Sequence, residues 1–142
     1  MTVHLLRVPG NEAYGLIYPS QLAMLSPVEQ VTITNFMLQS IWTWIGKDDD
    51  EILCYMGLIP PTLLSDRAYL WLRTTEAMSE HVFVFVRYSQ RVISEMLQDF
   101  PIIVGHCEVS AAKSIRWVQW LGAEFGAPEG RLVPFTIRAK HG

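Results

Sequence analysis

Runs of apolar residues divide the chain into segments of two kinds. Short runs rich in β-branched and aromatic residues, typical of strands, lie at 2–8, 40–46, 51–58, 68–72, 102–109 and 132–137. A polar turn, Lys47 to Asp50, joins the second and third runs and predicts a hairpin. The run at 68–72 is almost wholly apolar, which predicts a strand in the middle of a sheet.

Longer segments with helical spacing separate these runs. Ser26, Pro27 and Glu29 have the order of a helix cap, a first-turn proline and a capping-box acid. Residues 81–97 begin like a strand, but their length and spacing favour a helix. Ser110 is predicted to cap a further helix. Short helices are expected at 11–18 and 20–25.

The order of these elements predicts one domain over residues 1–142. Its class is α/β (α+β), with a mixed, mostly antiparallel sheet of six or seven strands and helices on both faces. The chain shows no internal repeat, linker or low-complexity segment. Half of its residues are apolar and 18% are charged, which excludes a disordered chain and predicts a substantial core or a surface buried against partners.

Charge and composition exclude several functions. The formal net charge is −3 and the basic residues are scattered, so the footprint of a nucleic-acid-binding protein is missing. No apolar run approaches the ~20 residues of a membrane span, and no signal peptide is visible. Cys54 and Cys107 are expected to be reduced, buried packing residues. The acidic run 48–51 lacks the spacing of a calcium loop and predicts a solvated turn, so no metal site is expected.

Isolated candidates for catalysis have a simpler structural interpretation. His106 and Cys107 are adjacent in a predicted strand, so their side chains point to opposite faces and cannot form a nucleophile pair. Asp66 and Glu108 lie near strand ends, where either could deprotonate an amine. Their ordinary interpretation, as solvated carboxylates, is favoured.

Three stretches carry a resemblance to a known family. These are Trp44-Ile45-Gly46 with Ile52 to Gly57, then Tyr69 to Leu72, and finally Ser114-Ile115-Arg116-Trp117-Val118-Gln119-Trp120-Leu121-Gly122. Together they resemble the acyl-CoA-dependent N-acetyltransferases (the GNAT family). The resemblance implies a sheet that splays between its fourth and fifth strands to hold acetyl-CoA. By position, Leu72, Thr74 and Thr75 are the cofactor-binding candidates.

The same stretches depart from the family where its chemistry resides. The family's glycine-rich pyrophosphate loop corresponds to residues 73–80, which contain no glycine, and Glu76 and Glu80 would repel phosphate. Ala111 and Val118 stand where the family usually has Asn and the Tyr that protonates the leaving thiolate. We therefore expect no catalytic residues and no cofactor, with acetyl-CoA as the alternative.

A narrower resemblance covers nearly the whole chain. The hairpin 42–46, the strand end 70–75 and the segment 116–125 are similar to the internal virion protein A family (the gene thirteen product) of short-tailed bacteriophages of the T7 group. It implies a non-enzymatic late protein of virion morphogenesis, with other virion proteins as partners. Its location would be the host cytoplasm during assembly and then the virion interior. The alternative function is an active N-acetyltransferase with a divergent coenzyme loop.

Two tryptophans are the candidates for protein contact. Trp117 and Trp120 lie three residues apart, off the predicted core ridge of their helix (Ala111, Ile115 and Val118). Because tryptophan is enriched at interaction hot spots, they are either contact anchors or a secondary core.

Overall fold

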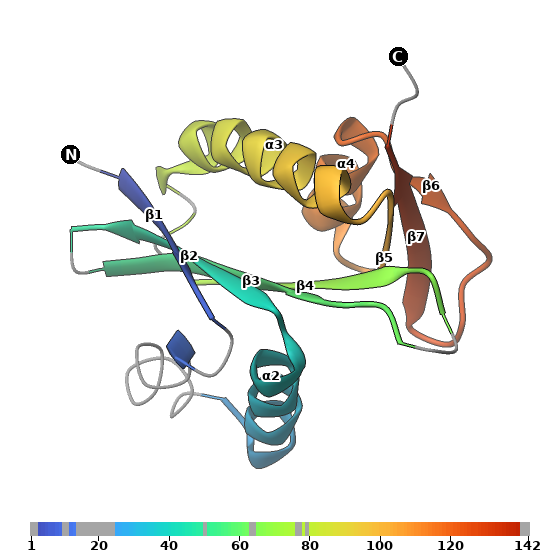
Figure 1. Cartoon of the computed structure of the whole chain (residues 1–142), viewed down its shortest axis with the longest axis horizontal. Helices are drawn as coiled ribbons and strands as arrows, with labels where there is room; N and C mark the ends of the chain where they lie inside the picture. The colour runs from blue at the N-terminus through green and yellow to red at the C-terminus, as the bar shows by residue number, and fades with distance from the viewer. Residues whose placement is uncertain are drawn as a thin grey trace. The chain divides into compact units, whose positions relative to one another are not determined.

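The computed structural model describes residues 3–9, 12–13, 25–49, 51–62, 65–75, 78 and 80–139. Its strands are β1 (Val3–Val8), β2 (Trp42–Asp48), β3 (Glu51–Ile59), β4 (Ala68–Thr74), β5 (Ile102–Glu108), β6 (Glu124–Phe125) and β7 (Leu132–Arg138). Its longer helices are α2 (Pro27–Gln39), α3 (Val82–Asp99) and α4 (Ala112–Trp120) (Figure 1). The short helices expected at 11–18 and 20–25 lie outside the described residues, except for Glu12 and Ala13, which are helical.

The strands form one seven-stranded sheet in the order β1-β2-β3-β4-β5-β7-β6. Pairing is antiparallel within β1-β2-β3 and within β5-β7-β6, and parallel between β4 and β5. The predicted fold class is therefore confirmed. The chain divides into two compact units, residues 1–60 with 71–81 and residues 61–70 with 82–142. Strand β4 contributes its first residues to the second unit and its last to the first unit.

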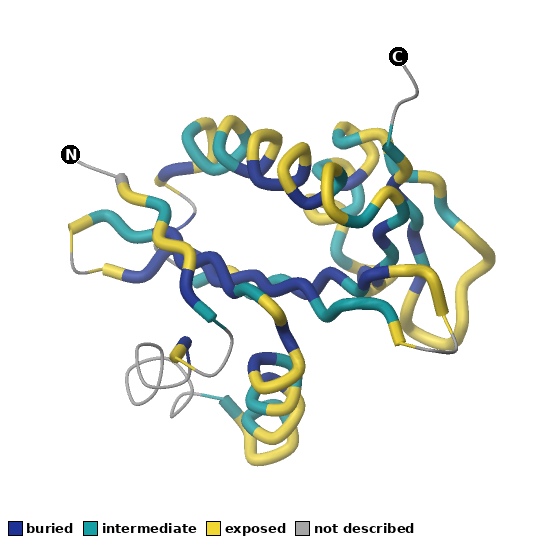
Figure 2. The backbone as a smooth tube through the Cα atoms, in the orientation of Figure 1, coloured by how far each residue is buried: buried dark blue, intermediate teal, exposed yellow. Residues whose placement is uncertain are grey.

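The first unit is organised around the β2–β3 hairpin. Strand β3 is buried along almost its whole length, as Figure 2 shows, and α2 packs against it. The predicted start of α2 is confirmed: the Ser26 hydroxyl accepts a hydrogen bond from the Glu29 backbone N–H at 3.2 Å, and Pro27 follows the cap. The inner face of α2 carries Ile33 and Met37, which are buried.

The second unit is built on the full-length pairing of β5 with β7, from Ile102 opposite Arg138 to Glu108 opposite Leu132. Helices α3 and α4 lie on one face of these strands (Figure 1). Gly105 of β5 makes this packing possible, because a Cβ there would lie 2.5 Å from the Phe135 ring. Parallel pairing of β4 with β5 runs from Ala68 opposite Ile103 to Tyr69 opposite Val104, at the first residues of both strands. The splay expected beyond these pairs stays a prediction.

Two details differ from the sequence prediction. Ala111, rather than Ser110, occupies the N-cap position of α4 and makes no side-chain capping bond. The backbone N–H of Ala111 instead donates to the Glu108 carbonyl, so a turn at the end of β5 sets where the helix starts. The second difference is β6, whose two residues are too few to show a period. Because β6 pairs with β7, Pro134 lies in a strand with neighbours on both sides rather than at a sheet edge.

Candidate functional site

The segment that leaves β4 lies in the first unit, where the resemblance would place a coenzyme loop. Thr75 is fastened there to β3: its hydroxyl lies 2.7 Å from the carbonyl oxygen of Ile52 and 3.1 Å from that of Leu53. The Thr75 backbone N–H also donates to the Leu53 carbonyl, at 2.9 Å. Both donors of this residue are therefore directed into the protein.

The rest of the segment continues as short turns. The Met78 N–H donates to the Thr75 carbonyl at 3.1 Å, and the His81 N–H donates to the Met78 carbonyl at 2.9 Å. Met78 is buried and Glu80 is exposed, whereas Glu76 lies outside the described residues. An anion-binding loop needs backbone N–H groups that point together at the ligand. In the described part of this segment, the N–H groups of Thr75, Met78 and His81 all have carbonyl partners.

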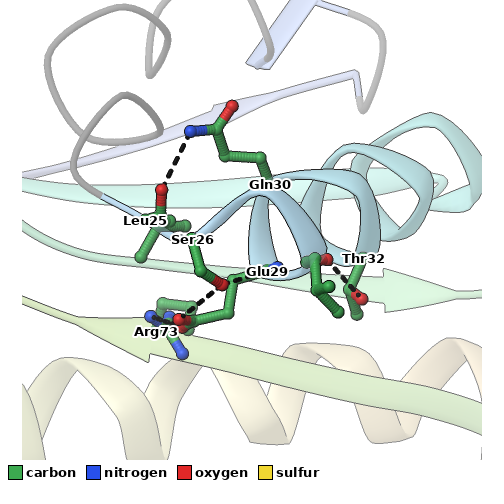
Figure 3. Close-up of polar contacts among 7 residues, drawn as sticks. Leu25, Ser26, Glu29, Gln30, Thr32 and Arg73 are labelled. Atoms are coloured by element: carbon green, nitrogen blue, oxygen red, sulfur yellow. Dashed lines mark hydrogen bonds and ion pairs between the residues drawn. The ribbon is translucent and has the colours of Figure 1, made fainter.

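Arg73 makes the strongest charged contact of the segment. Its guanidinium donates to Glu29 Oε2 at 2.8 Å, and the Ser26 hydroxyl donates to Glu29 Oε1 at 3.1 Å (Figure 3). The Ser26 hydroxyl and the Arg73 guanidinium together lower the pKa of the Glu29 carboxyl below its usual 4.5. Arg73 thus joins the end of β4 to the start of α2.

Trp71 packs the centre of the first unit. Its indole stacks on Phe36 of α2, with ring centroids 6.0 Å apart, and meets Tyr55 edge-on at 6.1 Å. Gly57 of β3 provides the space, because a Cβ there would lie 2.3 Å from the indole nitrogen. The indole N–H donates to the Ser40 hydroxyl, so this buried polar group is satisfied.

A buried histidine closes the segment. His81 Nε2 lies 3.4 Å from Asp48 Oδ2, at the end of β2. His81 Nδ1 and Asp48 Oδ1 are buried without a hydrogen-bond partner among the described residues. The acidic run predicted as a solvated turn therefore contributes one carboxylate to an interior contact. No group of three metal-binding side chains occurs in the part of the chain that the structure describes.

The second unit contains a separate polar pair. The Tyr69 hydroxyl lies 3.0 Å from His106 Nδ1, and the two rings are tilted with centroids 5.7 Å apart. Burial raises the pKa of Tyr69. His106 is exposed while Cys107 is buried, as their opposite directions in β5 predict. Burial also raises the pKa of both free cysteines, that of Cys54 to about 11, so neither has the character of a reactive thiolate.

The other sequence candidates do not assemble into a catalytic group. Asp66 is exposed beside Arg67 at 3.8 Å, and Glu108 is exposed at the end of β5. Leu72 is half-buried and Thr74 is exposed. Val118, at the position of the family's tyrosine, is the buried residue of α4.

The two contact candidates on α4 differ in their surroundings. The Trp117 indole N–H donates to the Ser89 hydroxyl of α3 at 2.9 Å, and its ring lies 5.3 Å from that of Phe85. The Trp120 side chain is 54% exposed and lines a groove of about 390 Å³. Other residues of this groove include Ile93 and Leu97 of α3 and Arg138 of β7.

Sequence reasoning missed the pairs that join distant segments. Arg73 and Glu29 are 44 residues apart, and Trp117 and Ser89 are 28 apart. Neither pair has a local pattern that announces it. Proximity along the chain could find the Ser26–Glu29 cap but not its third member.

Comparisons with solved structures identify the fold. The chain resembles an IAA acetyltransferase from Bacillus cereus over 97% of this chain and all of that one, with a TM-score of 0.69 and 11% identity. An aminoglycoside N(6')acetyltransferase from Legionella pneumophila matches 96% of this chain and 91% of its own, with a TM-score of 0.64 and 11% identity. A chimeric spermidine N-acetyltransferase from Vibrio cholerae covers 97% and 96%, with a TM-score of 0.64 and 12% identity.

The chain therefore has the GNAT acetyltransferase fold. No protein-family model matches it. No curated protein matches it either. None of these comparisons shows the narrower phage family. Among the described residues, no helix is long and apolar enough to cross a membrane.

Proposed function

We propose that this protein is a non-enzymatic internal virion or morphogenesis protein of a short-tailed bacteriophage, which uses an acetyltransferase fold for protein contacts. Support for the phage assignment comes from the sequence motifs at 42–46, 70–75 and 116–125. Support for the loss of enzymatic activity comes from the segment after β4. A fold by itself does not determine function, so the proposal depends on this segment.

The observation that carries the proposal is the bonding of Thr75. A pyrophosphate clamp requires free backbone donors and no intruding side chain. Here the Thr75 N–H and hydroxyl both bond to carbonyl groups of β3, and the following described N–H groups close turns. Binding of a diphosphate at these donors would require breaking several internal hydrogen bonds, each with a net contribution of about 0.5–1.5 kcal/mol.

Two further positions weaken the case for acetyl transfer. Val118 cannot donate a proton to a leaving thiolate, and its side chain is buried in the helix packing. Arg73 matches the first position of the family's loop, but its guanidinium is paired with Glu29. Both residues therefore serve the packing of the fold.

The direct test is acetyl-CoA binding by calorimetry and thermal shift, with an active GNAT enzyme as the positive control. We expect no shift in Tm at millimolar acetyl-CoA. A ligand present at a hundred times its Kd stabilises the folded state by about 2.7 kcal/mol, which a melting curve detects easily. A clear shift at micromolar acetyl-CoA would refute the proposed absence of a cofactor.

An active N-acetyltransferase remains the second candidate, and the fold similarity favours it. Three structures that cover 96–97% of this chain are described as acetyltransferases. The two candidates differ in one measurement: release of coenzyme A from acetyl-CoA in the presence of polyamine, aminoglycoside or peptide amines. Turnover that persists in the purified protein would establish the enzyme and remove the contact role from first place.

The contact role is tested in particles. We propose that the protein is present in the host cytoplasm during assembly and then inside the virion, held by other virion proteins. Trp120→Ala should reduce incorporation into particles by about thirtyfold, the equivalent of roughly 2 kcal/mol, without lowering Tm. Normal incorporation of this variant would exclude Trp120 as the anchor, and absence of the wild-type protein from purified particles would exclude the virion role.

A further inference from the structure

Helix α2 is apolar on both of its faces. The face that carries Ile33 and Met37 is buried in the first unit. On the opposite face, Val28, Val31 and Leu38 are 76%, 61% and 60% exposed, and Ile41, just beyond the helix, is 43% exposed. These four residues, with Asn35 between them, form what we call the outer stripe (Figure 2). A surface helix normally places charged residues there.

The outer stripe carries no charge at all. The helix contains a single charged residue, Glu29, and its carboxylate is bound to Arg73 and Ser26. The remaining exposed residues of the helix are neutral: Pro27, Thr32, Asn35 and Gln39. An exposed face of this kind marks an interaction surface rather than ordinary solvent-facing helix.

The spacing along the stripe fits a second copy of the same helix. Val31 and Leu38 lie four residues before and three residues after Asn35, while Val28 and Ile41 lie seven before and six after. An antiparallel pair of such helices, related by a twofold axis at Asn35, would place Val31 of each copy beside Leu38 of the other. It would also bring Val28 beside Ile41. This reciprocal pairing is what a twofold interface requires.

We propose that the protein self-associates through α2, as a twofold antiparallel helix pair centred on Asn35. The absence of charge removes the like-charge repulsion that opposes contact between identical surfaces. Facing Asn35 side chains can hydrogen-bond to each other and fix the register of an otherwise apolar seam. This inference does not depend on coenzyme binding or on a virion role, so it can fail or succeed separately.

The size of the stripe sets the strength of the dimer. Thirteen helical residues extend about 20 Å, so the contact is smaller than the roughly 800 Å² per partner of a standard stable interface. The dimer should therefore be weak and depend on protein concentration, a property suited to assembly at high local concentration.

The first experiment is sedimentation of the full chain over a concentration series up to the millimolar range. Wild type should shift from monomer to dimer, and Val31→Glu should weaken dimerisation at least tenfold while Tm stays unchanged. Val82→Glu is the matched control, because Val82 is a similarly exposed aliphatic residue at the start of α3, where an acid is compatible with the helix. A wild type that stays monomeric throughout, or a Val31→Glu variant that dimerises normally, overturns the proposal.

The second experiment tests the register. Asn35→Cys should form an intermolecular disulfide under mild oxidation, because the two Asn35 positions lie together on the twofold axis. The native cysteines do not interfere, since Cys54 and Cys107 are buried. Val82→Cys supplies the background rate of random collision. If the two variants crosslink equally fast, the antiparallel pair centred on Asn35 is wrong.

Discussion

The Trp71 indole N–H donates a hydrogen bond of 2.8 Å to the Ser40 hydroxyl, which in turn donates to the Phe36 carbonyl at 2.6 Å. This relay connects the buried middle of β4 to the last turn of α2. It satisfies the polar atom of the largest aromatic side chain in the first unit, so packing and hydrogen bonding converge on one residue.

Trp71→Ala should lower the free energy of unfolding by roughly 3–5 kcal/mol, since it empties a central site. Trp71→Phe keeps part of the ring and loses the N–H, so a smaller loss is expected. Urea denaturation of both variants measures the difference. A denaturation midpoint that stays unchanged in Trp71→Ala would mean that this strand does not pass through the core.

Gly57→Ala should destabilise the protein by about 1–3 kcal/mol, because the added methyl group meets the indole of Trp71. The nearest atoms are Nε1, Cε2 and Cζ2, which phenylalanine lacks. The same substitution should therefore cost less in a Trp71→Phe background. A double-mutant cycle of unfolding free energies isolates this coupling, and strictly additive effects would argue against the contact.

Glu29 should make stability fall in acid. Its pKa in the folded state is lowered by the Ser26 and Arg73 contacts, so its contribution is fully present above the unfolded pKa and is lost as pH falls through the folded pKa. Wild type should lose stability relative to Glu29→Gln as pH drops below the ordinary carboxyl value of 4.5. Unfolding curves at several pH values, repeated in high salt to screen the charges, measure this difference.

Both cysteines should resist alkylation in the native protein. Burial raises the pKa of Cys54 to about 11 and also raises that of Cys107, so little thiolate forms at mildly alkaline pH. Mass spectrometry after iodoacetamide treatment at pH 8 should find neither residue modified, and both modified after unfolding in urea. Rapid native labelling of Cys54 would indicate that the β3 strand opens.

Trp117 and Trp120 should respond differently to replacement. Trp117→Ala removes the hydrogen bond to Ser89 and the contact with Phe85, so it should cost roughly 2 kcal/mol or more. Trp120→Ala removes a mostly exposed ring and should change stability by no more than about 0.5 kcal/mol. Thermal melts of the two variants decide between core and contact roles for each residue.

Local signals predicted most of the fold. The Ser26, Pro27 and Glu29 pattern correctly located the start of α2, and helical spacing correctly overrode the strand-like start of α3. The same local reasoning was wrong at Ser110, because the carbonyl of Glu108 in the preceding turn set the start of α4. Short-range patterns cannot show such a bond.

The candidate site was much less predictable. Its defining contacts, Arg73 to Glu29 and Thr75 to the carbonyl of Ile52, join residues separated by 44 and 23 positions. The missing glycines were visible in the sequence, but the partners of the Thr75 donors depend on how β3 and β4 are brought together. Tertiary contacts of this kind arise from the packing of whole elements.

Strand β7 imposes an order on the synthesis of the second unit. It pairs with β5 on one side and β6 on the other, yet both of those strands leave the ribosome before Leu132 does. Until β7 arrives, the β5 edge that will pair with it presents unpaired backbone groups, which are prone to join the strands of other chains. Translation that pauses just before Leu132 would therefore prolong the period in which the nascent chain needs protection from aggregation.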